Sequence, residues 1–245
     1  MAALCRSASL QNSPFIIFNF FKKCPPTPGF KTFADEWKAM CSVVFKYSND
    51  ILSAQLHENL DSKGKYKIIT YHEFSRRGYN STEDPPLSTP DWGNMLHGAY
   101  NVGQEFHKGE YRELSTIHGV QFAPTIPQSD KSVFIIASYR ASEEIALKNI
   151  EERWQEWSVL RFIDHRAGHD LGMHNLGIYK RFSRTGIFTY IIRGEFTGLN
   201  GDITAGWDLV NKVRSARMPH GLVFDDISLY RIRPSNIIQL TDIFI

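Results

Sequence analysis

The chain has 245 residues, with 28 Lys and Arg against 26 Asp and Glu, so its formal net charge is +2. Its apolar fraction of 42% and charged fraction of 22% are those of an ordinary folded protein. This composition excludes a disordered chain, a collagen-like fibre and a bundle of membrane-spanning helices. Because no long run of basic residues occurs, we expect no nucleic-acid partner and no membrane-binding patch.

In chain order, the predicted elements follow a β-α-β-β-α-β pattern twice. In the first half, the predicted strands lie near 14–22, 51–60, 65–75 and 115–123, and the predicted helices near 30–47 and 91–108. In the second half, the predicted strands lie near 132–139, 171–182, 187–197 and 225–233, and the predicted helices near 142–163 and 202–217. Apolar residues at steps of three and four indicate the first helix of each half.

The two halves also resemble each other in sequence, which predicts a duplicated unit. Trp37 and Trp154 are 117 residues apart, and the same offset aligns Leu56-His57 with Met173-His174. Further matches require small loop insertions. They pair Pro14-Phe15-Ile16-Ile17 with Val133-Phe134-Ile135-Ile136, Glu73-Phe74 with Glu195-Phe196, Asp91-Trp92 with Gly206-Trp207, and the segment from His118 with the segment from Ser228.

The predicted first strand of each half is apolar on both faces. Phe15, Ile17 and Phe21 alternate with Ile16, Phe18 and Phe20. The helices of a β-α-β-β-α-β unit cover only one face of its sheet, so the other face needs a second cover. We therefore predict an α+β fold in which two ferredoxin-like repeats pack sheet to sheet as an α/β barrel.

This element order, with its repeated apolar positions, resembles the dimeric α/β-barrel superfamily, including antibiotic-biosynthesis-monooxygenase-like and stress-responsive members. The resemblance implies a first repeat at 13–123 and a second at 131–234. Members usually build the barrel from two subunits, whereas both halves lie here on one chain. The apolar tail 235–245 is expected to dock on its own barrel or on a partner chain, which would then be a homo-oligomer.

Two histidines are candidates for chemistry, because imidazole titrates near neutral pH and offers a nitrogen lone pair. His57 and His174 fall at matched places on the second strand of each half, and both could face the barrel interior as a base, a haem ligand or a metal pair. The alternative is a repeated structural histidine. The nearby His165, His169 and His174 are interpreted as a loop cluster, and no metal site is predicted.

The resemblance also implies a haem site, because some members use an Asn on the first strand with a Trp and a His around the second helix. Asn19, Trp92 and His97 match these residue types. The Trp–His spacing is shorter than the family's, and the second half has Ser138 and Trp207 without a helix histidine. Haem is therefore a possible cofactor of the first half alone, and packing is the alternative role of Trp92.

These observations lead to two hypotheses for function. The first is a protein that binds a small apolar or aromatic ligand in an apolar cavity, with oxygenase-like activity on an aromatic or polycyclic substrate. The second is a non-catalytic binding or assembly subunit whose barrel is filled by aromatic side chains. Three cysteines without a CxxC pair predict a reducing, cytoplasmic location, with a mitochondrial one as the alternative because residues 1–14 are Ser-rich and lack acids.

Overall fold

The computed structural model describes residues 14–47, 51–75, 104–118, 126–141, 158–167, 171–182, 187–218 and 221–239. The first half contains β1 (Phe15–Lys23), α2 (Phe33–Tyr47), β2 (Ile51–Asn59), β3 (Ile68–Phe74) and β4 (Glu105–Ile117). The second half contains β5 (Val133–Ala141), α5 (Ser158–Ala167), β6 (Met173–Arg181), β7 (Tyr190–Phe196), the short 3-10 helix Gly198–Asn200, α6 (Thr204–Ser215) and β8 (Leu222–Gln239).

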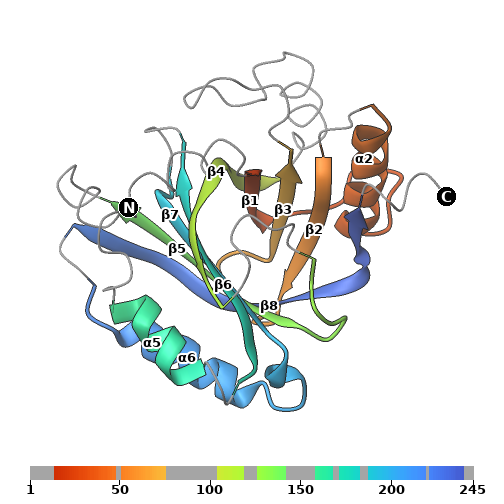
Figure 1. Cartoon of the computed structure of the whole chain (residues 1–245). Coiled ribbons are helices and arrows are strands. Elements are labelled where there is room, and N and C mark those ends of the chain that lie inside the picture. Colours follow the sequence, from red (N-terminus) through yellow and green to blue (C-terminus); the bar gives the residue numbers. More distant parts are fainter. Residues whose placement is uncertain are drawn as a thin grey trace.

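The eight strands form one closed antiparallel barrel in the order β1-β3-β2-β8-β5-β7-β6-β4 (Figure 1). Within it, the first half has the order β4-β1-β3-β2 and the second half the same order, β8-β5-β7-β6. The pairs β2–β8 and β4–β6 join the two sheets along two seams. Closure leaves no free sheet edge, which confirms the predicted α+β barrel.

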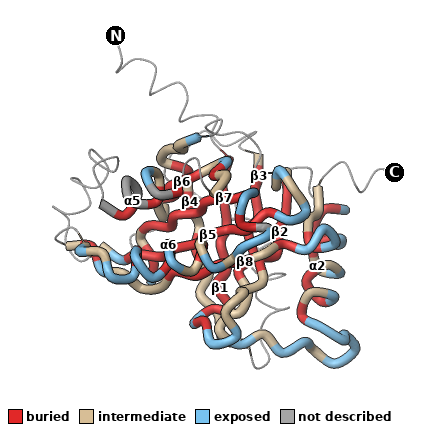
Figure 2. Tube along the Cα trace, turned by 90° about the horizontal axis from the view of Figure 1, so that it is seen from below, coloured by how far each residue is buried: buried red, intermediate tan, exposed pale blue. Residues whose placement is uncertain are grey.

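Helices cover the outside of the barrel. Helix α2 lies against the first sheet, and α5 and α6 lie against the second (Figure 1). Thr32 caps the N-terminus of α2. Its hydroxyl accepts a hydrogen bond from the backbone N–H of Asp35, and the Asp35 carboxylate accepts one from the backbone N–H of Thr32. Strands are mostly buried and helices expose their outer faces (Figure 2). No described helix has both the length and the hydropathy needed to cross a membrane.

The alternation of apolar residues in β1 separates two cores, as predicted. Phe15, Ile17 and Phe21 pack under α2. The opposite face fills the barrel interior together with aromatic residues from other strands. That interior core comprises Ile16, Phe18, Phe20, Tyr66, Ile69, Tyr71, Tyr111, Phe134, Ile136, Tyr179, Phe188, Ile191, Tyr230 and Ile232. The expected apolar centre is therefore occupied by rings, several in edge-to-face contact, such as Phe18 with Tyr111 at 5.5 Å between centroids.

A charged group lies within this aromatic interior. Arg193 of β7 is 1% exposed, and its guanidinium stacks over Phe134 at 4.5 Å and Tyr71 at 5.1 Å. Its Nη2 donates to Oε1 of Gln55 at 2.9 Å and its Nε to Nε2 of His57 at 3.5 Å. Among the described carboxylates, none lies within ion-pair distance of Arg193. Arg193 thus links the second half to β2 of the first through neutral acceptors.

Two predicted boundaries were wrong. Residues 105–108 were expected to end a helix, but they begin β4, which ends at Ile117 rather than 123; residues 91–103 lie outside the described residues. Polar residues on both faces of β4 concealed its alternation. The last strand was expected to end near 233, but β8 continues to Gln239, and Ser53 of β2 pairs with Gln239. This part of the tail therefore docks on its own barrel.

The register also corrects part of the predicted repeat. Glu73 pairs with Ile16 on β1 and Glu195 with Phe134 on β5, so the two glutamates are equivalent, as predicted. Ile16 is then the counterpart of Phe134, whereas the sequence match paired Phe15 with Phe134. A shift of one residue moves a side chain to the other face of a strand, and Phe15 packs under α2 while Phe134 faces the barrel interior.

Candidate functional site

Five polar side chains of the first sheet lie together on its helix-facing surface. They are Asn19 on β1, Thr70 and His72 on β3, and Lys108 and Glu110 on β4, which we call the sheet-face patch. In the ladders, Asn19 lies between Thr70 and Lys108, while Ile17 lies between His72 and Glu110. Two adjacent rows across three strands therefore bring residues from distant parts of the chain together.

The register identifies the counterpart of each patch residue in the second half. Ala137 of β5 pairs with Ile192 and Ile227 as Asn19 pairs with Thr70 and Lys108. Ile135 pairs with Gly194 and Leu229 as Ile17 pairs with His72 and Glu110. Every polar residue of the patch is thus matched by an apolar residue or glycine, so the fold itself does not require polarity at these positions.

Asn19 and Thr70 form the buried centre of the patch. Asn19 is 2% exposed, and its Nδ2 donates to Oγ1 of Thr70 at 2.9 Å. A buried amide and hydroxyl that satisfy one another cost little, whereas either one alone would remain unpaired in an apolar layer. The prediction from sequence placed Asn19 in a site, and the structure places it in the middle of this patch.

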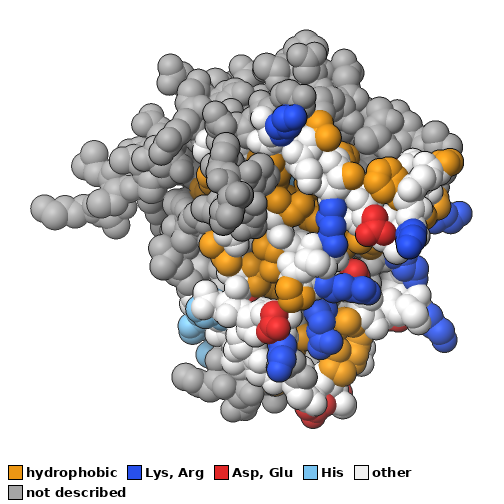
Figure 3. Space-filling view, turned by 90° about the vertical axis from the view of Figure 1, so that its right-hand side faces the viewer, with side chains coloured by type: hydrophobic (Ala, Val, Ile, Leu, Met, Phe, Trp, Pro, Cys, Tyr) orange, Lys and Arg blue, Asp and Glu red, His pale blue; other side chains and the backbone are white. Residues whose placement is uncertain are grey.

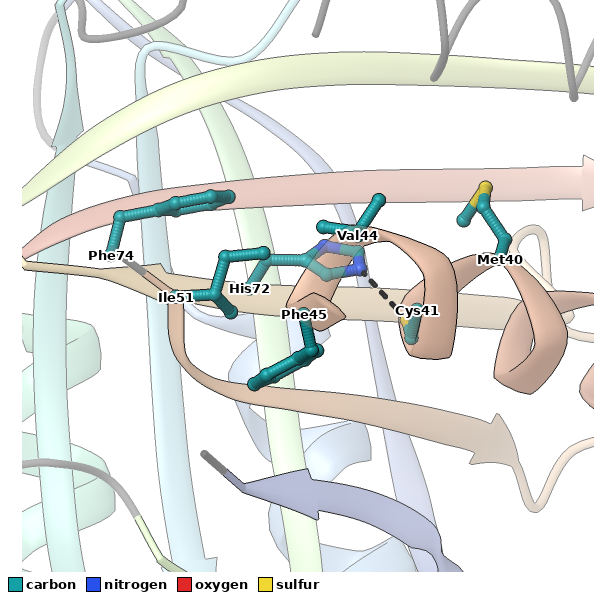
Figure 4. Close-up of a pocket in the computed structure, with 7 residues that line it drawn as sticks. All are labelled: Met40, Cys41, Val44, Phe45, Ile51, His72 and Phe74. Carbon is teal, nitrogen blue, oxygen red and sulfur yellow. Dashed lines mark hydrogen bonds between the residues drawn. The ribbon is translucent and has the colours of Figure 1, made fainter. Parts of the chain in front are cut away.

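His72 lies beside α2 in a small apolar pocket lined by Met40, Cys41, Val44, Phe45, Ile51, His72 and Phe74 (Figure 4). Trp37 Nε1 donates to His72 Nε2 at 3.3 Å, and Cys41 Sγ lies 3.9 Å from the same nitrogen. With Nε2 as an acceptor, the neutral tautomer carries its proton on Nδ1. His72 therefore keeps one N–H donor at Nδ1.

Burial and the nearby Lys108 ammonium lower the pKa of His72 to about 4. The imidazole is therefore neutral at physiological pH. Burial also raises the pKa of the Cys41 thiol well above its usual range. Cys41 is thus a protonated, weakly nucleophilic thiol that packs as a small apolar residue.

Lys108 and Glu110 carry the charges of the patch. Lys108 Nζ lies 3.8 Å from Oε1 of Glu110, near the limit of an ion pair, and the two side chains are 20% and 21% exposed. A contact of this length leaves the ammonium free to turn toward another acceptor. The patch therefore offers one cation, one carboxylate and neutral donors next to an apolar pocket.

The structure separates the other predicted site residues from this patch. His57 is fully buried inside the barrel, where burial and the Arg193 guanidinium lower its pKa well below the ordinary value. His174 is exposed at a bulge of β6. In register, His57 pairs with Ile69 as Tyr179 pairs with Ile191, so Tyr179, not His174, is the counterpart of His57. Trp92 and His97 lie outside the described residues.

The sheet-face patch and its pocket do not fit a haem group. The pocket at His72 encloses about 10 Å³, room for a single water molecule, whereas small-molecule sites enclose about 300–1,000 Å³. The lone pair of His72 Nε2 is occupied by the Trp37 N–H, and Asn19 is bound to Thr70. An axial imidazole with a free lone pair is thus lacking among the described side chains of this face, and we assign no chemistry through haem.

Sequence reasoning missed Thr70, His72, Lys108 and Glu110. A signal was present in the second half, where the matching strand carries Ile192 and Gly194 in place of Thr70 and His72. The Glu73–Glu195 match already aligned these two strands, but the correct register of β1 and β4, which carry the rest of the patch, was known only from the ladders.

Solved structures with similar folds are chlorite dismutases and related proteins. A mutant chlorite dismutase from Candidatus Nitrospira defluvii in complex with cyanide is 11% identical, with a TM-score of 0.52, covering 94% of this chain and 96% of that one. Another mutant of that enzyme is 12% identical, with a TM-score of 0.50, covering 95% and 96%. An anthrone oxidase-like protein is 9% identical, with a TM-score of 0.47, covering 96% and 97%.

At these identities the likeness shows the fold alone, a ferredoxin-like α/β barrel. No curated protein sequence matches the chain. A family profile described as Domain of unknown function (DUF7153) matches residues 51–231, which is most of the chain and includes strands of both sheets. The protein is therefore a member of the DUF7153 family, with the fold of a dimeric α/β barrel.

Proposed function

We propose that the protein binds a small aromatic or polycyclic ligand at the sheet-face patch of its first half and acts on it as an oxygenase-like oxidoreductase, with molecular oxygen as the oxidant. The observation that carries this proposal is the contrast between the two halves. The five polar residues of the patch all have apolar or glycine counterparts in the second sheet, whereas Arg112, farther along β4 on the same face, is matched by Arg231. Since the fold accepts apolar residues there, a ligand is the reason we assign for the polar ones.

The chemistry of the patch supports an aromatic ligand with an oxygen substituent. Trp37, Phe45 and Phe74 supply apolar surface for rings. The neutral imidazole of His72 and the ammonium of Lys108 supply hydrogen-bond donors for an oxygen atom of the ligand. An aromatic molecule is larger than the 10 Å³ cavity, so binding requires side chains of α2 to move. Met40 at the rim of the pocket is flexible and suited to this (Figure 4).

A ligand panel tests the proposal. Anthraquinone, alizarin, riboflavin and haemin are titrated into the protein while Trp fluorescence and ligand absorbance are followed. We expect saturable binding of the polycyclic quinones to the wild type. Binding should be lost in the double variant Asn19→Ala, Thr70→Ile, which copies Ala137 and Ile192. It should be retained in Ser138→Ala, which removes an equally buried hydroxyl at the barrel end. Oxygen uptake with a bound, reduced polycycle then tests activity.

A non-catalytic binding or assembly subunit is the second candidate, and the filled barrel interior favours it. The basic residues on the face that carries α2 and β2 are interspersed with apolar and acidic ones (Figure 3), so a protein partner suits this face better than a polyanion. Failure of every ligand to bind would support this candidate. Analytical ultracentrifugation would then test for the homo-oligomer that we propose together with it.

A further inference from the structure

We infer that Lys108 makes the sheet-face patch selective for a ligand bound as an anion, namely the phenolate or enolate form of a hydroxylated aromatic molecule. This inference rests on the proposed function, because it specifies which class of aromatic ligand the patch takes. It depends on the place of Lys108 in the ladders, on its loose ion pair and on its uncharged counterpart in the second half.

The position of Lys108 has no structural need for charge. It pairs with Asn19 across β1 and β4, and its counterpart Ile227 pairs with Ala137. Ile227 is fully buried in the apolar core of the second half. An isoleucine therefore fits this position of the barrel, and a partly buried ammonium in its place bears a desolvation cost that an aliphatic side chain would not.

The carboxylate of Glu110 compensates the positive charge of Lys108 only in part. The Lys108–Glu110 contact is 3.8 Å, compared with 2.6 Å for the exposed pair Lys22–Glu105. Lys108 also acts on His72, because its charge is one of the two causes of the lowered His72 pKa. A positive potential is thus present at the pocket. An anionic oxygen would gain from it, whereas a cationic ligand would be repelled.

Neutral donors complete the recognition of an oxygen anion. His72 is uncharged and keeps its Nδ1 proton, so it can donate to an oxyanion without losing a proton. The surrounding side chains are aromatic or aliphatic, which suits a ring system and disfavours a strongly hydrated anion such as phosphate. A phenol or enol is the ligand class that combines an apolar body with a single acidic oxygen.

The test measures the acidity of a bound phenol. Alizarin is a polycyclic phenol whose anion absorbs at longer wavelength than its neutral form. With saturating wild-type protein, we expect the apparent pKa of bound alizarin to fall by about 1–3 units relative to free alizarin. The shift should disappear in Lys108→Ile, which copies Ile227, and in Lys108→Gln. It should persist in Lys108→Arg and in the control Lys22→Gln, which lies outside the patch.

The outcomes separate this inference from the proposed function. Saturable binding with an unshifted alizarin pKa, or a shift that survives in Lys108→Ile and Lys108→Gln, overturns the inference while supporting the ligand site. Anthraquinone has no acidic hydroxyl. If it binds as tightly as alizarin at neutral pH, the inference is likewise overturned while the ligand site is supported. No saturable binding of either molecule contradicts both. Circular dichroism and urea unfolding of each variant show whether it is folded.

Discussion

Arg193 Nε lies 3.5 Å from His57 Nε2, so a fully buried cation from the second half contacts a fully buried imidazole from the first. This contact crosses the barrel interior and links β7 to β2. The same guanidinium donates to Gln55 at 2.9 Å, so Arg193 makes two polar contacts between the two sheets inside the barrel.

We predict that the volume of Arg193 matters more to stability than its charge. Arg193→Ala removes a large buried side chain and its stacking on Phe134, and should lower the free energy of unfolding by about 3–5 kcal/mol. Arg193→Met keeps most of the volume and avoids burying a charge, so its cost should be below about 1.5 kcal/mol. Urea unfolding measures both variants. An equal loss in the two would show that the hydrogen bonds of the guanidinium hold the barrel together.

Stability should fall as the pH drops below about 6.5, the ordinary histidine pKa. The folded state lowers the pKa of His57 well below this value and that of His72 to about 4. Between the folded-state and unfolded-state pKa values, these histidines bind protons in the unfolded chain but not in the folded one, so acidification favours unfolding. Each histidine contributes a slope of up to about 1.4 kcal/mol per pH unit.

Urea unfolding at pH values from 4.5 to 7.5 tests this dependence. The variant His72→Gln should lose less stability than the wild type below pH 6.5, because one of the histidines with a lowered pKa is gone. Above pH 7 the two pH profiles should have the same slope. Identical pH profiles in wild type and variant would mean that His72 titrates in the folded protein as it does in the unfolded one.

Gly109 should not tolerate a side chain, because a Cβ there would overlap the ring of Tyr111, which is fully buried. We expect Gly109→Ala to cost about 1–3 kcal/mol through overpacking. Gly201→Ala is the matched control, since nothing lies within 4 Å of its added Cβ. Thermal or urea unfolding compares the two. A neutral Gly109→Ala would show that the ring of Tyr111 moves within the barrel.

Asn19 and Thr70 should show strong coupling in a double-mutant cycle. Asn19→Ala leaves the buried Thr70 hydroxyl without its donor and should cost about 1–3 kcal/mol. Adding Thr70→Ile removes that hydroxyl and reproduces the apolar pair found in the second half. The double variant should therefore regain part of the lost stability. Additive losses in urea unfolding would contradict the idea that the fold itself accepts apolar residues at the patch.

Much of the architecture was predictable because it depends on local patterns. Alternating apolar residues in 14–22 and in 132–139 required two buried faces, and the structure buries both. The Glu73–Glu195 match placed the third strands of the two halves in register. The start of β4 was not predictable, because polar residues on both faces of the strand, among them Lys108 and Glu110, interrupt its apolar pattern.

The site was predictable only in part. Asn19 was identified by residue type and strand, and it lies in the sheet-face patch. His57 and His174 were paired by an offset of 117 residues, whereas the ladders make Tyr179 the counterpart of His57 in the second half. An insertion in a loop changes the offset without a visible trace in the strand, and the period-2 geometry then exchanges the inside for the outside.

The sequence by itself determined the class of elements, the two-sided burial of the strands and hence a barrel, because side-chain alternation and burial are properties of each strand. Tertiary structure alone decided which half carries the polar surface, since Asn19, His72 and Lys108 lie on three strands that are neighbours only through hydrogen-bonded ladders. A patch built across strands depends on register. Register depends on how all eight strands close, which no single segment encodes.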